Sequence, residues 1–152
     1  MRYYIAYGSN LNLSQMALRC PKSEVFGSAC LNDYELLFRG TMGNSHATIA
    51  PKKGSSVPIL VWRVPKADEK RLDIYEGYPR YYFKQELDVL VDGKAVTAMV
   101  YIMNLSRKPG LPSPAYVEAI RQGYEDNGFN QEDLYEAIDR NIAECSKKKA
   151  IQ

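Results

Sequence analysis

The first twelve residues place a short strand directly before a tight turn and a helix start. The segment from Arg2 to Ala6 is rich in Tyr and Ile, as half-buried strands are. Gly8-Ser9-Asn10 then interrupts the apolar pattern. Asn12 is a good helix N-cap, and Gln15 three residues later completes a capping box. A strand end and a helix start must therefore lie next to each other in this chain.

The turn between them has two interpretations. In the first, it only connects the two elements, with Gly8 supplying an unusual φ angle and Asn10 a side-chain cap. In the second, its successive N–H groups form a concave nest for an anion such as a carboxylate. The helix start would add unpaired donors and the positive end of the helix dipole. The turn by itself does not decide between the two.

The rest of the chain predicts one α+β domain. Short β-branched and aromatic runs from Ser23 to Val64, broken by Gly, Pro, Asn and Ser, suit an antiparallel sheet. Lys66 to Tyr75 has the pattern of a short helix. Tyr81 to Met103 predicts a hairpin around Asp92-Gly93. Because we find no repeat or linker, we expect a single domain over residues 1–146 and a basic tail over residues 147–152.

The last third of the chain predicts two helices. The first begins at Ser113-Pro114 and ends at Asn127-Gly128. The second begins after Asn130. Its expected buried stripe consists of Leu134, Ile138, Ile142 and Cys145.

Composition excludes several classes of function. A formal charge of +2 is too small to indicate a nucleic-acid partner, and no apolar run is long enough to span a bilayer. Cys20, Cys30 and Cys145 are an odd number without a C-x-x-C pair, which favours reduced thiols and a cytoplasmic location. His46 is the only histidine, so we expect no metal site. No pattern in the sequence sets the oligomeric state.

Glu76 is the candidate proton carrier. It falls at the expected C-terminal end of a helix, where the dipole disfavours a negative charge. Four tyrosines flank it: Tyr75, Tyr78, Tyr81 and Tyr82. Partial burial among them would raise its pKa toward the neutral range that a general acid/base needs. The alternative is a carboxylate that simply faces solvent.

Several segments together resemble the γ-glutamylcyclotransferase-like family. They are YGSNLN, HATIAP, VWRVPKADEKRLDIYEGYPRYY, AMVYIMN and PSPAYVEAIRQGYEDNGF, and they occur in the family's order. The resemblance covers Tyr4 to about Leu134. Its most specific parts are Tyr7–Leu11, Leu72-Asp73 with Glu76-Gly77, and Pro112-Ser113-x-x-Tyr116.

This resemblance implies a small mixed, mainly antiparallel β-barrel with flanking helices and a cavity at one side. It also implies an enzyme that releases 5-oxoproline from a γ-glutamyl amino acid or amine. The α-amine of the substrate attacks its own γ-carbonyl and expels the leaving amine. The implied partner is thus a small-molecule γ-glutamyl substrate, and no cofactor or metal is implied.

The resemblance also assigns roles to residues. Glu76 matches the family's catalytic glutamate and would act as general acid/base. Tyr101 matches a site tyrosine that would bind substrate or orient Glu76. The residues implied to bind the glutamyl α-carboxylate are Tyr7, Gly8, Ser9, Asn10 and Leu11.

The tyrosines are assigned in two groups. Neighbours on a strand point to opposite faces, so we expect only one of Tyr81 and Tyr82 to enter the cavity, and favour Tyr82. Four others are expected to pack in the core: Tyr3, Tyr34, Tyr116 and Tyr124.

Rival functions stay open at this point. The same fold could bind a γ-glutamyl or other carboxylate ligand without turnover, or regulate a partner. A hydrolase would use Ser9 or a cysteine with His46 as base, but Y-G-S-N lacks the G-x-S-x-G nucleophile elbow. Nucleic-acid binding through RYYFK and the lysine tail is disfavoured by the near-balanced charge.

Overall fold

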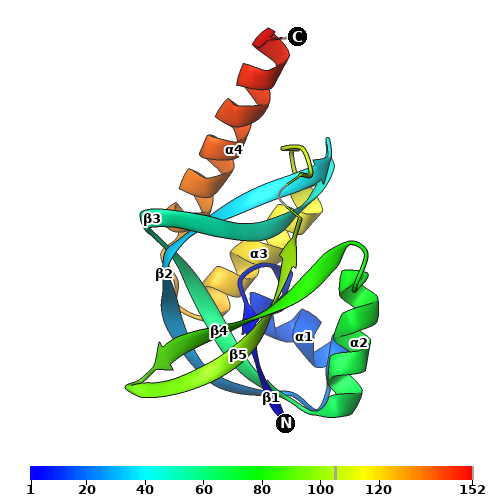
Figure 1. The fold of residues 1–152 in the computed structure, drawn as a ribbon, viewed down its shortest axis with the longest axis vertical. Helices are drawn as coiled ribbons and strands as arrows, with labels where there is room; N and C mark the ends of the chain where they lie inside the picture. Colours follow the sequence, from blue (N-terminus) through cyan, green and yellow to red (C-terminus); the bar gives the residue numbers. More distant parts are fainter. Residues whose placement is uncertain (105, 152) are drawn as a thin grey trace.

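The computed structural model describes residues 1–104 and 106–151, with side chains as far as Lys147. The described residues form five strands and four α-helices (Figure 1). The strands are β1 (Arg2–Ala6), β2 (Glu24–Thr41), β3 (Asn44–Val64), β4 (Tyr82–Val91) and β5 (Lys94–Met103). The helices are α1 (Leu13–Arg19), α2 (Lys66–Glu76), α3 (Pro114–Asp126) and α4 (Gln131–Ile151), with a 3₁₀ turn η1 (Ser9–Leu11) before α1.

The five strands form one mixed sheet in the order β2-β3-β1-β5-β4. Only β1 and β5 run parallel, and every other neighbouring pair is antiparallel. The sheet is strongly curled, so its two edges approach: a Cβ placed on Gly27 of β2 would lie 2.6 Å from Cγ1 of Val91 of β4 (Figure 1). No strand pairing joins β2 to β4 within the described residues. The predicted α+β class and mixed sheet are confirmed, and the barrel is an open one.

Strands β2 and β3 are longer than the short runs of the sequence suggested. They form one continuous hairpin with register shifts at Val25/Gly27 and Asn32/Tyr34. Strand β1 pairs only with the end of β3, from Leu60 to Val64. The prolines of β3 therefore fall where β3 has a single strand neighbour, a position at which a missing N–H is tolerated.

Most local start and stop signals act as predicted, but the capping box at α1 forms only in part, because the Gln15 side chain accepts from Arg19 and the Asn12 amide donates to the Ser9 carbonyl. The Asn12 side chain accepts a hydrogen bond from the Gln15 amide at 3.0 Å, which caps α1. Ser113 caps α3 in the same way. Gly77 ends α2 in the left-handed conformation, with φ of 65°. Asp92-Gly93 turns the β4–β5 hairpin with positive φ at both residues.

The buried face of α4 differs from the expected stripe. Ile142 is 45% exposed, whereas Ala137 and Asn141 are buried. The Asn141 side chain donates to the Gly110 carbonyl at 2.8 Å, and this bond turns its face of the helix inward. The helix continues away from the curled sheet to Ile151 (Figure 1). The boundary between a domain ending at residue 146 and a basic tail stays a prediction.

None of the helices in the described part of the chain combines the length and the apolar character needed to cross a membrane.

Helix α3 packs directly on the turn that follows β1. A Cβ on Gly123 would lie 2.6 Å from Cβ of Leu11 and 2.8 Å from the Asn12 amide nitrogen. The Asn127 side chain donates to the Leu11 carbonyl at 2.8 Å, and the Asn12 side chain to the Ala119 carbonyl at 3.1 Å. This close contact fixes the position of η1.

We expect Gly123→Ala to destabilise the protein by about 1–2 kcal/mol. In an exposed helix the same change would stabilise by up to ~1 kcal/mol, but here overpacking against Leu11 costs ~1–3 kcal/mol. Urea unfolding followed by circular dichroism measures the difference. The exposed Glu125→Ala in the same helix serves as control and should stay within about 0.5 kcal/mol of wild type. A Gly123→Ala protein as stable as wild type would contradict the close packing.

Candidate active site

A small cavity lies where the ends of β1 and α2 meet the starts of β3, β4 and α3. Its volume is about 140 Å³, well below the ~300–1,000 Å³ of pockets that enclose drug-sized ligands. The wall is largely tyrosine. The lining residues are Tyr4, Ile5, Tyr7, Gly8, Ser9, Asn10, His46, Ala47, Tyr75, Glu76, Tyr81, Tyr82, Tyr101 and Tyr116.

The turn after β1 lines this cavity with Gly8, Ser9 and Asn10, and some of its backbone donors have no partner within the turn. Its internal hydrogen bonds begin only at Leu11, whose amide donates to Gly8, and at Asn12, whose amide donates to Ser9. The first amides of a helical turn have no acceptor inside it, which leaves those of Ser9 and Asn10 for another partner. Gly8, Ser9 and Asn10 line the cavity as expected, but Leu11 does not, because it is fully buried beneath α3.

The side chains of the turn are used to position its neighbours. Asn10 donates to the Tyr4 hydroxyl at 2.9 Å and accepts from Arg19 at 2.6 Å. The Ser9 hydroxyl lies 3.0 Å from that of Tyr75. The Arg19 guanidinium also stacks 3.9 Å from the centre of the Tyr75 ring. These contacts hold the turn in place and engage its side chains, so the amides of Ser9 and Asn10 are the donors left for a ligand.

Glu76 places a carboxyl group at the cavity wall. Burial raises the pKa of Glu76 to about 7, although the positive charge of Arg19 works against the rise. No hydrogen bond or ion pair engages its carboxylate within the described residues. Burial also raises the pKa of Tyr4 and Tyr7 well above the ordinary value, and the nearby Glu76 charge adds to this. Near neutral pH the site thus holds a titratable carboxyl group among neutral phenols.

Most of the tyrosine hydroxyls at the cavity are bound to the protein. Tyr7 donates to the Tyr101 carbonyl at 2.5 Å, and Tyr82 donates to the Ala47 carbonyl at 2.6 Å. The Tyr116 hydroxyl accepts from the Ala47 amide at 3.0 Å. Their rings therefore shape the wall, and their hydroxyls tie β1, β3, β4, β5 and α3 together around it.

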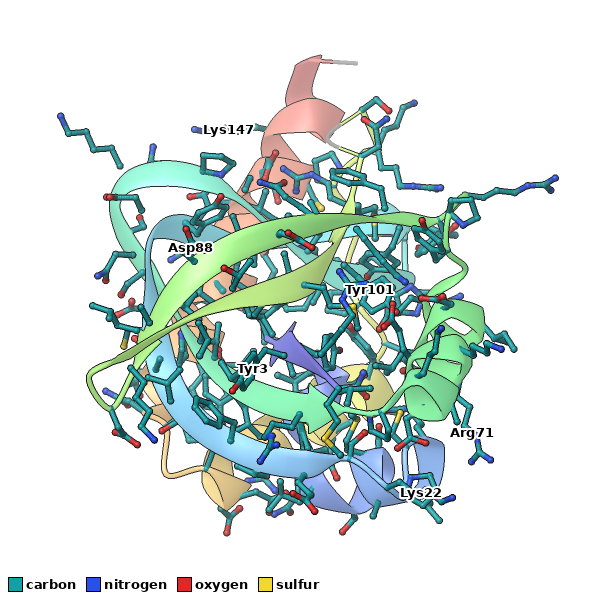
Figure 2. All side chains as sticks on the ribbon, turned by 60° about the horizontal axis from the view of Figure 1, so that its bottom comes forward. Tyr3, Lys22, Arg71, Asp88, Tyr101 and Lys147 are labelled. Carbon is teal, nitrogen blue, oxygen red and sulfur yellow. The ribbon has the colours of Figure 1, made fainter. Side chains whose placement is uncertain are left out.

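Tyr101 points from β5 toward α2 (Figure 2). Its hydroxyl donates to Asp73 at 2.5 Å. The same Asp73 carboxylate lies 2.7 Å from the Lys84 ammonium group. Tyr101 has no direct hydrogen bond to Glu76, so it can orient that residue only by holding α2, on which both Asp73 and Glu76 lie.

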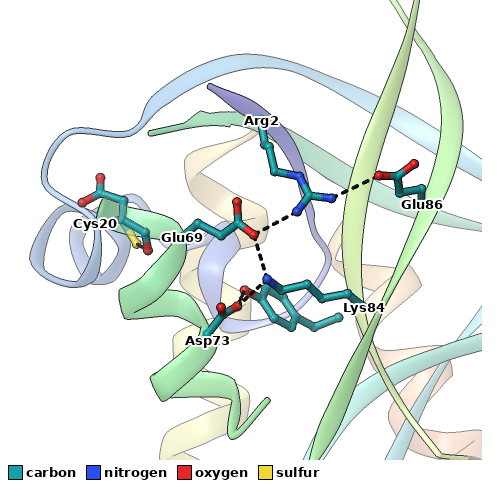
Figure 3. Close-up of polar contacts among 8 residues, drawn as sticks. Arg2, Cys20, Glu69, Asp73, Lys84 and Glu86 are labelled. Atoms are coloured by element: carbon teal, nitrogen blue, oxygen red, sulfur yellow. Dashed lines mark hydrogen bonds and ion pairs between the residues drawn. The ribbon is translucent and has the colours of Figure 1, made fainter. Parts of the chain in front are cut away.

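A chain of charges fixes α2 beside the sheet (Figure 3). Glu69 of α2 pairs with Arg2 of β1 at 2.9 Å and with Lys84 of β4 at 2.7 Å. Lys84 then pairs with Asp73 one turn further along α2. The side chains of Glu69 and Lys84 are largely buried, at 15% and 16% exposure, which makes the pairing stronger than that of surface ions. The end of α2, with Glu76, is held by these contacts.

One expectation about the tyrosines is wrong. Tyr81 and Tyr82 both line the cavity, with ring centres 5.3 Å apart. Strand β4 begins only at Tyr82, so the alternation of faces does not extend to Tyr81. Tyr116 packs against the core as expected, and it lines the cavity as well.

Sequence reasoning missed other residues of the wall, namely Tyr4, Tyr75 and His46, together with Arg19 behind the turn. Tyr116 carried a signal, because it belongs to the specific Pro112-Ser113-x-x-Tyr116 segment. Tyr75 and His46 also belong to quoted segments of the resemblance, whereas Arg19 lies outside those segments and reaches the Tyr75 ring through the tertiary fold. No cluster of three or more metal-binding side chains occurs among the residues that the structure describes.

Comparisons with known proteins agree on one family. The family model described as "Gamma-glutamyl cyclotransferase, AIG2-like" matches residues 4–119. The human protein named gamma-glutamylcyclotransferase is 35% identical over 136 residues, which cover 83% of this chain and 71% of that protein. Its mouse counterpart of the same name is 35% identical over 139 residues, covering 85% of this chain and 73% of that protein.

Solved structures give the same result. A structure titled gamma-glutamyl cyclotransferase superposes with a TM-score of 0.80 and 31% identity, covering 90% of this chain and 85% of that one. YkqA from Bacillus subtilis superposes with a TM-score of 0.76, covering 93% of this chain and 54% of that one. At 20% identity, the second likeness concerns the fold alone.

The raised pKa of Glu76 predicts a pH-dependent cost in stability. The folded state holds the proton up to a pH of about 7, whereas an ordinary glutamate loses it near 4.5. Stability therefore falls as pH rises from about 4.5 to about 7. We expect Glu76→Gln to be more stable than wild type by about 1–3 kcal/mol at pH 8, with the difference vanishing toward pH 4.5.

Urea unfolding at pH 5 and pH 8 measures this difference. The exposed Glu24→Gln provides the matched control and should show no such pH-dependent gain. Equal stability of Glu76→Gln and wild type at pH 8 would mean that the carboxylate is well solvated.

Proposed function

The chain belongs to the gamma-glutamyl cyclotransferase, AIG2-like family, and we propose that it releases 5-oxoproline from a γ-glutamyl amino acid or amine with Glu76 as general acid/base. The observation that carries this proposal is the unpaired Glu76 carboxyl, of pKa about 7, in a small cavity that Gly8, Ser9 and Asn10 of the turn also line. A glutamyl group has a carboxylate for the N–H groups of that turn and an α-amine for that carboxyl.

In this proposal the turn from Tyr7 to Asn10 binds the α-carboxylate of the substrate. The amides of Ser9 and Asn10 have no acceptor inside the turn, and the start of a helical turn attracts negative charge. Tyr7 and Tyr82 would contact the glutamyl chain through their rings, because their hydroxyls are bound to backbone carbonyls. Tyr101 would contribute one wall and hold α2 through Asp73. Leu11 would support the turn from below.

Glu76 would take a proton from the substrate's α-ammonium group. An α-amino group has a pKa of about 8. Transfer from it to a carboxylate of pKa about 7 is uphill by only one unit, or ~1.4 kcal/mol. Transfer to an ordinary glutamate of pKa 4.5 would cost ~5 kcal/mol. Burial of Glu76 therefore makes the amine available as a nucleophile near neutral pH.

The freed amine then closes the ring. Its nitrogen forms a bond to the γ-carbonyl carbon, and the bond from that carbon to the leaving nitrogen breaks. Glu76 returns its proton to the leaving nitrogen, so an amine or amino acid departs and the carboxylate is regenerated. Because nucleophile and carbonyl belong to one molecule, the cavity chiefly has to hold the glutamyl chain in its folded, attacking conformation.

We place this reaction in the cytoplasm. Cys20 and Cys30 are both free thiols, and the exposed thiol of Cys30 is suited to a reducing compartment. We propose no nucleic-acid or membrane partner for the reaction.

We expect wild type to release 5-oxoproline from at least one member of a panel of γ-glutamyl amino acids and amines. Glu76→Gln should lose ~10²–10⁴-fold in kcat/KM, because it keeps the shape of the side chain and removes only the proton acceptor. Chromatographic measurement of 5-oxoproline gives the rates.

The pH dependence of wild type provides the control for this role. The acid limb of kcat/KM should lie near pH 7, since protonated Glu76 cannot accept the substrate's proton. Activity of Glu76→Gln close to that of wild type would identify another group as the base. Absence of product from every substrate, with 5-oxoproline or a γ-glutamyl compound still bound, would indicate a binding module.

We expect Gly8→Val to weaken substrate binding. A Cβ at Gly8 would already lie 3.3 Å from Cβ of Ala47 and 3.4 Å from the Tyr116 hydroxyl, so the valine methyl groups must enter the cavity or displace its wall. Loss of one hydrogen bond to a charged group corresponds to a roughly 10- to 100-fold rise in KM. Steady-state kinetics with the best substrate of the panel provides the measurement.

Gly8→Ala is the graded control for this experiment, because its single methyl group makes a close but tolerable contact. Its KM should lie between those of wild type and Gly8→Val. An unchanged KM in the valine variant would place the substrate carboxylate elsewhere.

A further inference from the structure

The size of the cavity limits how much of a substrate it encloses. At about 140 Å³ it suits a glutamyl group, and the leaving group must extend to its mouth. If the proposed function holds, the side chains at the mouth decide which leaving groups are accepted. Tyr81 and His46 are partly exposed residues of the cavity wall, with the Tyr81 hydroxyl 3.1 Å from Nδ1 of His46, and we take them as one side of the mouth.

A cation lies against Tyr81 without an acidic partner. The Arg107 guanidinium lies 4.3 Å from the centre of the Tyr81 ring. No carboxylate among the described residues pairs with it. Arg19, behind the turn, also lacks a carboxylate partner, but its guanidinium donors are used by the side-chain oxygens of Asn10 and Gln15. Arg107 therefore has donors available for a ligand.

Hydrogen bonds hold the backbone at Arg107 and after it. Its amide donates to the Asn104 carbonyl at 3.2 Å, and the following Lys108 carbonyl accepts from Gly40 at 2.9 Å. The Ser45 hydroxyl then donates to the Gly110 carbonyl at 2.7 Å. The same β2–β3 hairpin that supplies His46 to the cavity thus holds the segment that carries Arg107.

The positive charge at this part of the mouth comes from Arg107. Burial lowers the pKa of His46, so the imidazole is neutral near pH 7. Burial raises the pKa of Tyr81, which stays a neutral phenol despite the opposing charge of Arg107. A carboxylate placed beyond Tyr81 would meet a guanidinium that can donate two parallel hydrogen bonds.

We propose that Arg107 binds the carboxylate of the leaving group, so that γ-glutamyl amino acids are preferred over γ-glutamyl amines that lack a carboxylate. In a γ-glutamyl amino acid this carboxylate is two bonds from the leaving nitrogen, just outside the space that the glutamyl group fills. The inference rests on the proposed function, and it makes Arg107 a specificity-determining residue, not a participant in the proton transfers.

The test compares γ-glutamyl-alanine with γ-glutamyl-alaninamide, in which only the alanine carboxylate is replaced by a carboxamide. The two leaving groups have the same shape and differ in charge. Wild type should favour the acid in kcat/KM by roughly 10- to 100-fold, the range expected for a hydrogen-bonded charged pair. In Arg107→Gln the ratio should fall close to one, mainly through a higher KM for the acid. Arg107→Lys should keep part of the preference. The neighbouring Lys108→Gln is the matched control, because that side chain is exposed, and its ratio should equal that of wild type.

The outcomes separate this inference from the proposed function. Turnover of both substrates with equal efficiency in wild type overturns the role of Arg107 and leaves the cyclotransferase activity standing. A preference for the acid that survives in Arg107→Gln overturns it too. Failure of wild type to release 5-oxoproline from either substrate, or from the wider panel, overturns the proposed function and this inference with it.

Discussion

The attachment of α2 to the sheet determines what Glu76 can do. Glu69, Asp73 and Glu76 are spaced four and three residues apart, so they share one face of the helix. The first two are paired with Lys84, and Glu69 also with Arg2. Because partly buried charges need partners, these pairs fix the rotation of the helix about its axis. Glu76, the last on that face, is thereby turned toward the cavity with no such partner.

The neighbouring carboxylates Asp73 and Glu76 differ in their partners and therefore in their roles. Asp73 is neutralised by Lys84 and by the Tyr101 hydroxyl, and it serves as an anchor. Glu76 has only the distant influence of Arg19 to offset burial, so its pKa rises to about 7. A carboxylate that is unfavourable for folding at high pH is the one with a proton affinity suited to an amine substrate. In the proposed reaction, stability is therefore reduced at the residue that would transfer the proton.

The tyrosines around Glu76 form a wall whose hydroxyls are already bound. Tyr7 and Tyr82 donate to backbone carbonyls of β5 and β3, and Tyr116 accepts from β3. These bonds join elements that are far apart in the sequence, so the cavity keeps its shape without a ligand. A preformed cavity of this kind lowers the entropy cost of holding a flexible glutamyl chain in one conformation.

The sequence alone determined the features that depend on neighbouring residues. The Asn12 and Ser113 caps, the Asp92-Gly93 turn and the place of Glu76 before Gly77 were predictable because each depends on contacts within one helical or reverse turn. The order of the quoted motifs predicted the family, and the strand and helix patterns together predicted the α+β fold class.

Only the tertiary structure decided which side chains meet at the cavity. Tyr116 and His46 reach it, whereas Leu11, two residues from Ser9 in the sequence, lies beneath α3. Arg107 contacts Tyr81 because the start of β4 lies beside the end of β5. The β2–β3 hairpin also holds the segment after β5 in place. The curl of the sheet and the packing of Gly123 on the turn determine which side chains come into contact at the cavity. Both arise from contacts between distant segments. Periodicity along a single segment reports which face of it is buried, but it carries no information about what that face will touch.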